Sequence, residues 1–237
     1  MPDKFLEGRL ALVTGASRGI GAATAEALGS AGAHVVLTAR TASALEEVEE
    51  RIHSAGGNAT IAPLDLTESD SIARLAAAVA ERWGRLDLLM INAAMLGTLT
   101  PVAQADPKEL SRLFTLNVLA TQALIAAFDP LLRKSEAGRL IAVTSSVAQR
   151  ARAYWGPYGA TKAALENLAL AYAEEVRNLS QVRVAILNPG PTATRMRARA
   201  YPGEDPATLK PPTAIADAVI ALLQRGFETG ERVELGK

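Results

Sequence analysis

Two residues with clear catalytic potential stand four positions apart, Tyr158 and Lys162. The segment from about Pro157 to Asn178 has a helical pattern, so the two side chains should share one helix face. An ammonium group near a phenol stabilises the phenolate, and we expect it to lower the tyrosine pKa from its reference value of about 10. Tyr158 would then serve as a general acid or base near neutral pH.

A serine strengthens this interpretation, because a Tyr and a Lys at this spacing also arise by chance. Ser145 precedes Tyr158 by thirteen residues and follows the apolar run from Arg139 to Val143. Ser146 is an alternative, since a slip of one residue in this loop would exchange the two. The thirteen-residue spacing favours Ser145.

Near the N-terminus, an apolar run from Leu10 to Val13 leads into three glycines, Gly15, Gly19 and Gly21. This Gly-x-x-x-Gly-x-Gly spacing is a variant of the dinucleotide-binding fingerprint. A helix of small residues follows, from Ala22 to Ala31. Bare backbone at a helix N-terminus predicts a phosphate site, although an ordinary strand-to-helix turn would share the pattern.

Arg40 follows the second apolar run, where a dinucleotide fold places the adenosine ribose. No carboxylate stands there to bind a free 2′-hydroxyl, and Arg18 in the glycine turn can reach the same region. Two guanidinium groups suit a 2′-phosphate, so the sequence favours NADP over NAD. The alternative is that Arg40 merely lies in a surface loop.

Apolar strands alternate with helices along the whole chain. We expect strands at 10–13, 34–38, 59–64, 86–91, 139–143, 182–187 and 232–235. We expect helices at 22–31, 41–54, from Thr67, from Asp106–Pro107 to about Phe128 with Pro130 ending it, at 157–178 and at 213–225, with 192–210 irregular. This pattern predicts an α/β fold, a Rossmann-type doubly wound parallel sheet of about seven strands with helices on both faces. Its ligand crevice should lie at the carboxyl ends of the strands.

Composition limits the classes of function. The 237 residues suit one domain, 49% are hydrophobic, and the formal net charge is zero, which argues against nucleic-acid binding. The absence of cysteine excludes disulfides and thiolate zinc sites. We see no apolar run of membrane-spanning length and no signal segment in Met1–Gly8, so we expect a soluble cytoplasmic protein.

The motifs together resemble the short-chain dehydrogenase/reductase family, from about Leu10 to the last strand. They are Thr14-Gly15-x-x-x-Gly19-x-Gly21, Asn92-Ala93-Ala94, Asn117, Ser145, Tyr158-x-x-x-Lys162 and Asn188-Pro189-Gly190. The resemblance implies that Tyr158 exchanges the proton and that Lys162 lowers its pKa and holds the nicotinamide ribose. It also implies that Ser145 polarises the substrate oxygen, that Asn117 holds a relay water, and that no metal takes part.

The resemblance also implies the residues that contact the cofactor. These are Gly15, Ser17, Arg18, Gly19, Ile20, Gly21, Arg40, Asp65, Leu66, Asn92, Ala93, Ala94, Tyr158, Lys162, Pro189, Gly190, Thr192 and Thr194. Two positions depart from the family's usual Asn-Asn-Ala-Gly, because Ile91 replaces the first Asn and Ala94 replaces the Gly. We expect these changes to tighten the cleft near the ribose.

The predicted function is an NADP-dependent oxidoreductase that interconverts a ketone or aldehyde with an alcohol. The alternative is a non-catalytic dinucleotide-binding regulator on the same fold. A substrate lid should lie at about 192–212 within a single domain, 1–237. There Arg195, Arg197 and Arg199 could receive an anionic group or could simply be solvated. From the resemblance we expect a homodimer or homotetramer.

Overall fold

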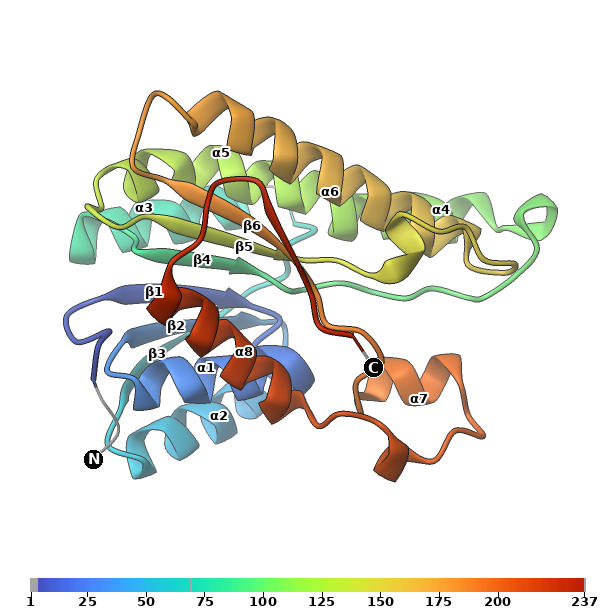
Figure 1. The fold of residues 1–237 in the computed structure, drawn as a ribbon, viewed down its shortest axis with the longest axis horizontal. Helices are drawn as coiled ribbons and strands as arrows, with labels where there is room; N and C mark the ends of the chain where they lie inside the picture. The colour runs from blue at the N-terminus through green and yellow to red at the C-terminus, as the bar shows by residue number, and fades with distance from the viewer. Residues whose placement is uncertain (1–3, 69, 237) are drawn as a thin grey trace.

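Seven strands form one sheet, and every neighbouring pair in it is parallel (Figure 1). The computed structural model describes residues 4–68 and 70–236. The strands are β1 (Leu10–Thr14), β2 (His34–Ala39), β3 (Asn58–Pro63), β4 (Leu88–Ile91), β5 (Arg139–Val143), β6 (Arg183–Asn188) and β7 (Glu231–Glu234), in the order β3-β2-β1-β4-β5-β6-β7. The predicted doubly wound sheet is confirmed.

Helices cover both faces of this sheet, which explains why its central strands are apolar throughout. One face carries α3 (Ser71–Trp83), α5 (Ala120–Arg133) and α6 (Gly156–Val176); the other carries α1 (Gly19–Ser30), α2 (Ala42–Ser54) and α8 (Pro212–Arg225) (Figure 1). Within β1, Leu12 packs in the first core and its neighbour Val13 packs in the second. Both side chains are fully buried.

The strand order reverses between β1 and β4. After β1 the chain runs through α1 to β2 on one side, and after β4 it runs to β5 on the other. The two loops therefore separate at the carboxyl ends of adjacent strands, which leaves a crevice there. This position brings the predicted chemistry of the chain to one edge of the sheet.

The predicted helix from Pro107 onward is one helical run with a π turn inside it. It comprises α4 (Pro107–Phe114), the π turn Thr115–Leu119, and α5. Asp106 caps α4 by accepting a hydrogen bond from the Lys108 amide at 3.0 Å, as the sequence predicts. Pro130 does not end the run, which continues to Arg133.

Core packing outweighs the hydrogen bond that Pro130 cannot make, because Leu131 and Leu132 are both buried against the sheet. The run 107–133 has 27 residues, and its most apolar 18-residue window has a mean hydropathy of 1.3, so by length and composition it could cross a membrane, contrary to our expectation. Its most apolar window is 44% buried within the fold, where α5 lies on the sheet.

Three other segments differ from the prediction by more than two residues. The first helix begins at Gly19 rather than Ala22. The third begins at Ser71 rather than Thr67, because Asp65 Oδ1 accepts hydrogen bonds from the Thr67 amide at 2.9 Å and hydroxyl at 2.7 Å and holds a turn there. The segment expected to be irregular, 192–210, contains α7 (Arg195–Ala200).

Candidate active site

A cleft of about 1820 Å³ lies at the carboxyl ends of the strands. It brings together nearly all the residues that the sequence singles out: Gly15, Ser17, Arg18, Gly19, Ile20, Arg40, Asp65, Leu66, Asn92, Ala93, Ala94, Ser145, Tyr158, Lys162, Pro189, Gly190, Thr192 and Thr194. Of the predicted set, Gly21 and Asn117 do not line it. Both lie behind the cleft and support it.

The glycine turn is locked to the loop after β4. Asn92 Nδ2 donates to the Thr14 carbonyl at 2.9 Å and to the Gly15 carbonyl at 3.3 Å. In return the Thr14 hydroxyl oxygen accepts from the backbone amides of Asn92 at 2.9 Å and Ala93 at 3.0 Å. The two loops of the switch point therefore hold each other in one geometry.

Gly21 contributes to this lock through close packing. A Cβ atom on Gly21 would lie 2.3 Å from the Gly15 carbonyl oxygen and 2.6 Å from Asn92 Nδ2. Only a residue without a side chain lets α1 approach the turn this closely. Gly21 therefore shapes the cleft without lining it.

The N-terminus of α1 is open to an anion. No side chain among residues 4–68 and 70–236 caps it, and its first turn carries no acidic residue. The first amides of a helix have no partner inside the helix and form its positive dipole end. Gly15 and Gly19 precede or begin this helix with φ of +66° and +57°, so the turn needs glycine at both positions.

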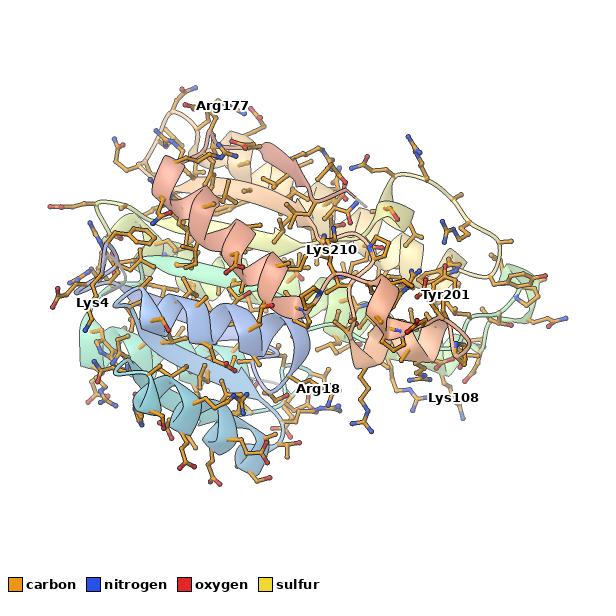
Figure 2. The ribbon with its side chains drawn as sticks, turned by 60° about the horizontal axis from the view of Figure 1, so that its bottom comes forward. Lys4, Arg18, Lys108, Arg177, Tyr201 and Lys210 are labelled. Atoms are coloured by element: carbon orange, nitrogen blue, oxygen red, sulfur yellow. The ribbon has the colours of Figure 1, made fainter. Side chains whose placement is uncertain are left out.

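Arg18 and Arg40 line the same end of the cleft, and both side chains are exposed. Figure 2 shows Arg18 at the end of α1. Within the described part of the chain, neither guanidinium takes part in an ion pair. Burial opposes ionisation of the nearby Asp65, yet hydrogen bonds from Thr67 and the charge of Arg40 hold the pKa of that carboxyl below its ordinary value.

Tyr158 and Lys162 lie one turn apart on α6, with the Lys162 Nζ atom 5.9 Å from the centroid of the Tyr158 ring. Both side chains are buried, with 6% and 2% of the residue surface exposed. Lys162 Nζ donates to the Val143 carbonyl at the end of β5, at 2.8 Å. Ser145 follows on the next loop and is half-buried, whereas Ser146 is exposed; both line the cleft.

Burial moves the pKa values of this pair in opposite directions. It raises the pKa of the Tyr158 phenol well above its ordinary value. It also lowers the pKa of Lys162 to about 8, against an opposing effect of the Glu166 charge. Our expectation that the ammonium lowers the tyrosine pKa is therefore wrong here, because desolvation of the phenolate dominates.

Glu166 is a buried carboxylate that the sequence analysis missed. It lies one turn beyond Lys162 and is 4% exposed. Its Oε1 accepts from the Thr144 hydroxyl at 2.7 Å, and its Oε2 accepts from Arg232 Nη1 of β7 at 2.5 Å. The glutamate thus connects the residue preceding Ser145 to the edge of the sheet. Its spacing of four residues from Lys162 was the one feature of the sequence that could have placed it on the same helix face.

Asn117 lies in the π turn and is fully buried. Its Oδ1 accepts from the Met95 amide at 2.9 Å, and its Nδ2 donates to the Met95 carbonyl at 2.9 Å and to the Thr161 hydroxyl at 3.0 Å. An extra residue in a helical turn redirects the side chains that follow it, and such turns are frequent at functional sites. Here Asn117 fastens the loop after β4 to the residue that precedes Lys162.

The loop after β6 leads into α7, which lies in the predicted lid segment. Gly190 has φ of +65°, and a Cβ there would lie 2.5 Å from the Leu235 carbonyl oxygen. The Thr192 hydroxyl donates to the Gly190 carbonyl at 3.2 Å, and the Thr194 hydroxyl accepts from the Arg197 amide at 3.2 Å, which caps α7. Both threonines therefore have structural contacts as well as positions in the cleft.

Helix α7, in the predicted lid segment, contacts Tyr158 directly. The Tyr158 hydroxyl donates to Met196 Sδ at 3.8 Å. Beyond the helix, the Tyr201 ring lies 5.8 Å from the Trp155 ring, and Arg152 Nη1 donates to the Tyr201 hydroxyl at 2.5 Å. Figure 2 shows Tyr201 at the end of α7. Sequence reasoning did not find the Met196 and Tyr201 contacts, which join residues far apart in the chain.

The three lid arginines differ in their surroundings. Arg197 forms two hydrogen bonds to the Glu204 carboxylate, at 2.5 Å and 2.6 Å, and its guanidinium stacks 3.8 Å from the centre of the Tyr201 ring. Arg195 and Arg199 are exposed. Glu204 therefore neutralises Arg197, and Arg195 and Arg199 are the two of the three that remain exposed.

The two residues that depart from the family pattern lie in different environments. Ile91 is 2% exposed and packs in the core with the helices α3, α5 and α6, so it does not face the cleft. Ala94 lines the cleft and is half-buried. Any tightening near the ribose therefore comes from Ala94 alone.

Comparison with known proteins gives a consistent result. A family model described as short chain dehydrogenase matches residues 9–205. The uncharacterized oxidoreductase YciK of Escherichia coli strain K12 is 38% identical over 222 residues, which cover 92% of this chain and 87% of that protein.

Solved structures resemble the whole fold. A structure described as a short chain dehydrogenase from Pseudomonas syringae is 39% identical, covers 98% of this chain and 96% of its own, and has a TM-score of 0.94. A Shigella flexneri protein of the same description, solved with NADP, is 36% identical, covers 98% of both chains and has a TM-score of 0.93. An Escherichia coli CFT073 protein, solved with NADPH, is 37% identical over 98% of this chain and 99% of its own, with a TM-score of 0.92.

Proposed function

The chain belongs to the short-chain dehydrogenase family of oxidoreductases, and from this premise we propose that it is an NADP(H)-dependent enzyme that interconverts a carbonyl and an alcohol. The observation that carries the proposal is the meeting of Tyr158, Lys162 and Ser145 with the glycine turn in one cleft. A protein that only binds a dinucleotide has no need of a buried proton donor beside its binding cleft.

The cleft fits a dinucleotide phosphate group. The uncapped amides of α1 and the turn at Gly15 and Gly19 offer a positive, side-chain-free surface for a pyrophosphate. Lys162 would hold the nicotinamide ribose, and Thr192 or Thr194 would orient the carboxamide. When bound, NADP(H) supplies or accepts the hydride.

The preference for NADP rests on Arg18 and Arg40. Both guanidinium groups are exposed in the cleft, and a 2′-phosphate would provide the bidentate partner that such groups favour. Asp65 lies in the same region and would contact the adenine. Relatives solved with NADP and NADPH support the same choice.

Proton transfer falls to Tyr158. Because burial raises the pKa of its phenol, the hydroxyl keeps its proton at neutral pH and can donate it to a carbonyl oxygen during reduction. Ser145 would donate a hydrogen bond to the same oxygen and polarise the carbonyl. The Lys162 ammonium would stabilise the phenolate that forms, and Asn117 would support the relay that returns the proton.

A fluorescence titration with NADPH and NADH, followed by a screen of ketones and aldehydes, tests this function. We expect tighter binding of NADPH, and we expect Tyr158→Phe to lower kcat by about 10²–10⁴-fold while NADPH binding persists. Replacing Arg18 and Arg40 together with Gln should weaken NADPH binding and leave NADH binding nearly unchanged.

The same measurements separate the enzyme from a regulator. Binding of NADPH without turnover of any carbonyl, in a protein whose Tyr158→Phe variant behaves identically, would favour the non-catalytic alternative. Tighter binding of NADH would overturn the roles of Arg18 and Arg40 without affecting the proton chemistry.

A further inference from the structure

Next to Tyr158 the cleft has an apolar lining that is separate from the two cores of the fold. Leu96, Val147 and Tyr158 form a third buried cluster, and Trp155 and Met196 pack against it. We call Leu96, Val147, Trp155 and Met196 the apolar wall. These side chains come from the loop after β4, the loop after β5 and the lid helix, so the fold brings them together only at the mouth of the cleft.

The apolar wall surrounds the hydroxyl that would donate the proton. Met196 Sδ is 3.8 Å from the Tyr158 hydroxyl oxygen, and the Trp155 ring lies 6.0 Å from the Tyr158 ring in an edge-on arrangement. A carbonyl oxygen must come within hydrogen-bond distance of that hydroxyl to be reduced. The substituent on the carbonyl carbon would then lie against the apolar wall.

Three charged side chains near the wall are held by hydrogen bonds to other residues. Arg197 is paired with Glu204, and Arg152 donates to the Tyr201 hydroxyl. Lys162 donates to the Val143 carbonyl, and its Nζ atom lies 5.9 Å from the centroid of the Tyr158 ring. The wall itself offers a carboxylate or phosphate no cation, so a charged substituent placed against it would lose water at a cost. Arg152 would offset that cost only by leaving the Tyr201 hydroxyl.

Building on the proposed function, we infer that the substrate is a neutral carbonyl compound whose substituent is apolar, and that Met196 sets this preference. An apolar substituent would replace the contact that Met196 now makes with Tyr158 and would bury its own surface against Trp155 and Val147. An anionic substrate received by Arg195 and Arg199 is the competing possibility, and the same experiment decides between them.

Two pairs of carbonyls matched in shape test the inference: 4-methylbenzaldehyde with 4-formylbenzoate, and 2-octanone with 7-oxooctanoate. With NADPH as reductant, we expect kcat/KM to be at least about tenfold higher for the uncharged member of each pair. Met196→Lys should shift that ratio toward the carboxylates by about tenfold or more, because the new ammonium faces the site of the substituent. NADPH titration of this variant checks that its cofactor site is intact.

Matched controls define the role of charge. Met196→Leu keeps the wall apolar and should preserve the ratio, and an Arg195→Gln/Arg199→Gln variant should also preserve it. A wild-type ratio near one, or a preference for the carboxylates, overturns the inference. Loss of such a carboxylate preference in the double variant would assign anion binding to the two exposed arginines.

A binding measurement separates this inference from the proposed function. Where a compound is not reduced, calorimetry gives its affinity for the protein–NADPH complex. Absence of NADPH oxidation with all four compounds would count against the proposed reaction, while the ratio of affinities within each pair would still confirm or overturn the preference for a neutral substituent.

Discussion

The cleft has two walls that are built in different ways. The glycine wall, residues 14–21 and 92–94, is held by hydrogen bonds that join a side chain to the main chain, made by the Asn92 amide and the Thr14 hydroxyl, and Gly21 packs against a carbonyl. The lid wall, α7 and residues 201–204, is held by contacts between two side chains: Tyr158 with Met196, Arg152 with Tyr201 and Arg197 with Glu204. A main-chain partner is present whatever residue stands at its position, whereas a contact between two side chains depends on both residues. The comparison suggests that the first wall serves a constant ligand and the second a particular substrate.

The largest effect should follow from adding one methyl group to the glycine wall. Gly21→Ala would place a Cβ atom 2.3 Å from the Gly15 carbonyl oxygen, and the backbone cannot yield cheaply there. We expect the free energy of unfolding to fall by about 1–3 kcal/mol and NADPH affinity to fall by more than about tenfold. Chemical denaturation and fluorescence titration measure the two quantities.

Gly203→Ala in the lid wall is the matched control, because among residues 4–68 and 70–236 no atom outside Gly203 and its two chain neighbours lies within 4 Å of its Cβ position. Its unfolding free energy should change by less than about 0.5 kcal/mol. Equal losses in the two variants would show that the walls do not differ in rigidity.

A second prediction compares two ion pairs. Arg232→Gln would leave the buried Glu166 carboxylate with Thr144 as its remaining partner, and because Arg232 is itself 38% exposed we expect a loss of about 1–3 kcal/mol in unfolding free energy. Glu204→Gln in the lid wall breaks a pair whose side chains are 22% and 27% exposed, and should cost less than about 1 kcal/mol. Thermal or urea unfolding of both variants gives the comparison.

A third prediction concerns pH. The Lys162 pKa of about 8 means that its ammonium is present below pH 8 and is lost as the pH rises through that value. If the ammonium is needed, kcat/KM for carbonyl reduction should be level below pH 8 and should fall by about tenfold per pH unit above it. A pH profile with NADPH and one carbonyl measures this directly.

Glu166 raises the Lys162 pKa, so Glu166→Gln should move the midpoint of that profile to lower pH. Glu174→Gln, at an exposed position on the same helix, should leave the midpoint in place. A profile that is identical in all three proteins would contradict the proposed part of Lys162 in the reaction.

The smallest effect should come from the lid wall. Tyr201→Phe removes one hydrogen bond, from Arg152, and keeps the ring beside Trp155. We expect KM for the carbonyl to rise by less than about tenfold, because one hydrogen bond contributes about 0.5–1.5 kcal/mol, while the Kd for NADPH stays the same. Tyr154→Phe, whose side chain is exposed, should change neither constant. A loss of NADPH affinity in Tyr201→Phe would mean that the two walls are coupled.

The two walls also differ in how far sequence reasoning reaches them. The glycine turn is predictable because a positive φ or close backbone packing requires glycine at each position. The apolar strands around it specify the sheet. The contact of Tyr158 with Met196 joins residues 38 positions apart, and that of Arg152 with Tyr201 joins residues 49 apart. Nothing in the local pattern encodes those distances.

Burial explains the other failures. The spacing of Tyr158 and Lys162 correctly places them on one helix, yet it contains no measure of the desolvation that raises the phenol pKa. The sequence predicts that Pro130 ends the helix, but the packing of Leu131 and Leu132 in the core keeps the helix going to Arg133. In each case a tertiary environment outweighs a local rule.

The π turn at Thr115–Leu119 changes the direction in which the side chains after it point. One additional residue rotates everything downstream by about 100° relative to an uninterrupted α-helix. Leu113 before the turn and Leu124 after it are both buried, although they are eleven positions apart across an insertion. Deleting one residue from the turn would restore regular helical geometry and would turn either the buried face of α5 or the Asn117 amide away from its present partners. The π turn therefore lets the Asn117 amide keep its hydrogen bonds while the apolar face of α5 stays packed on the sheet.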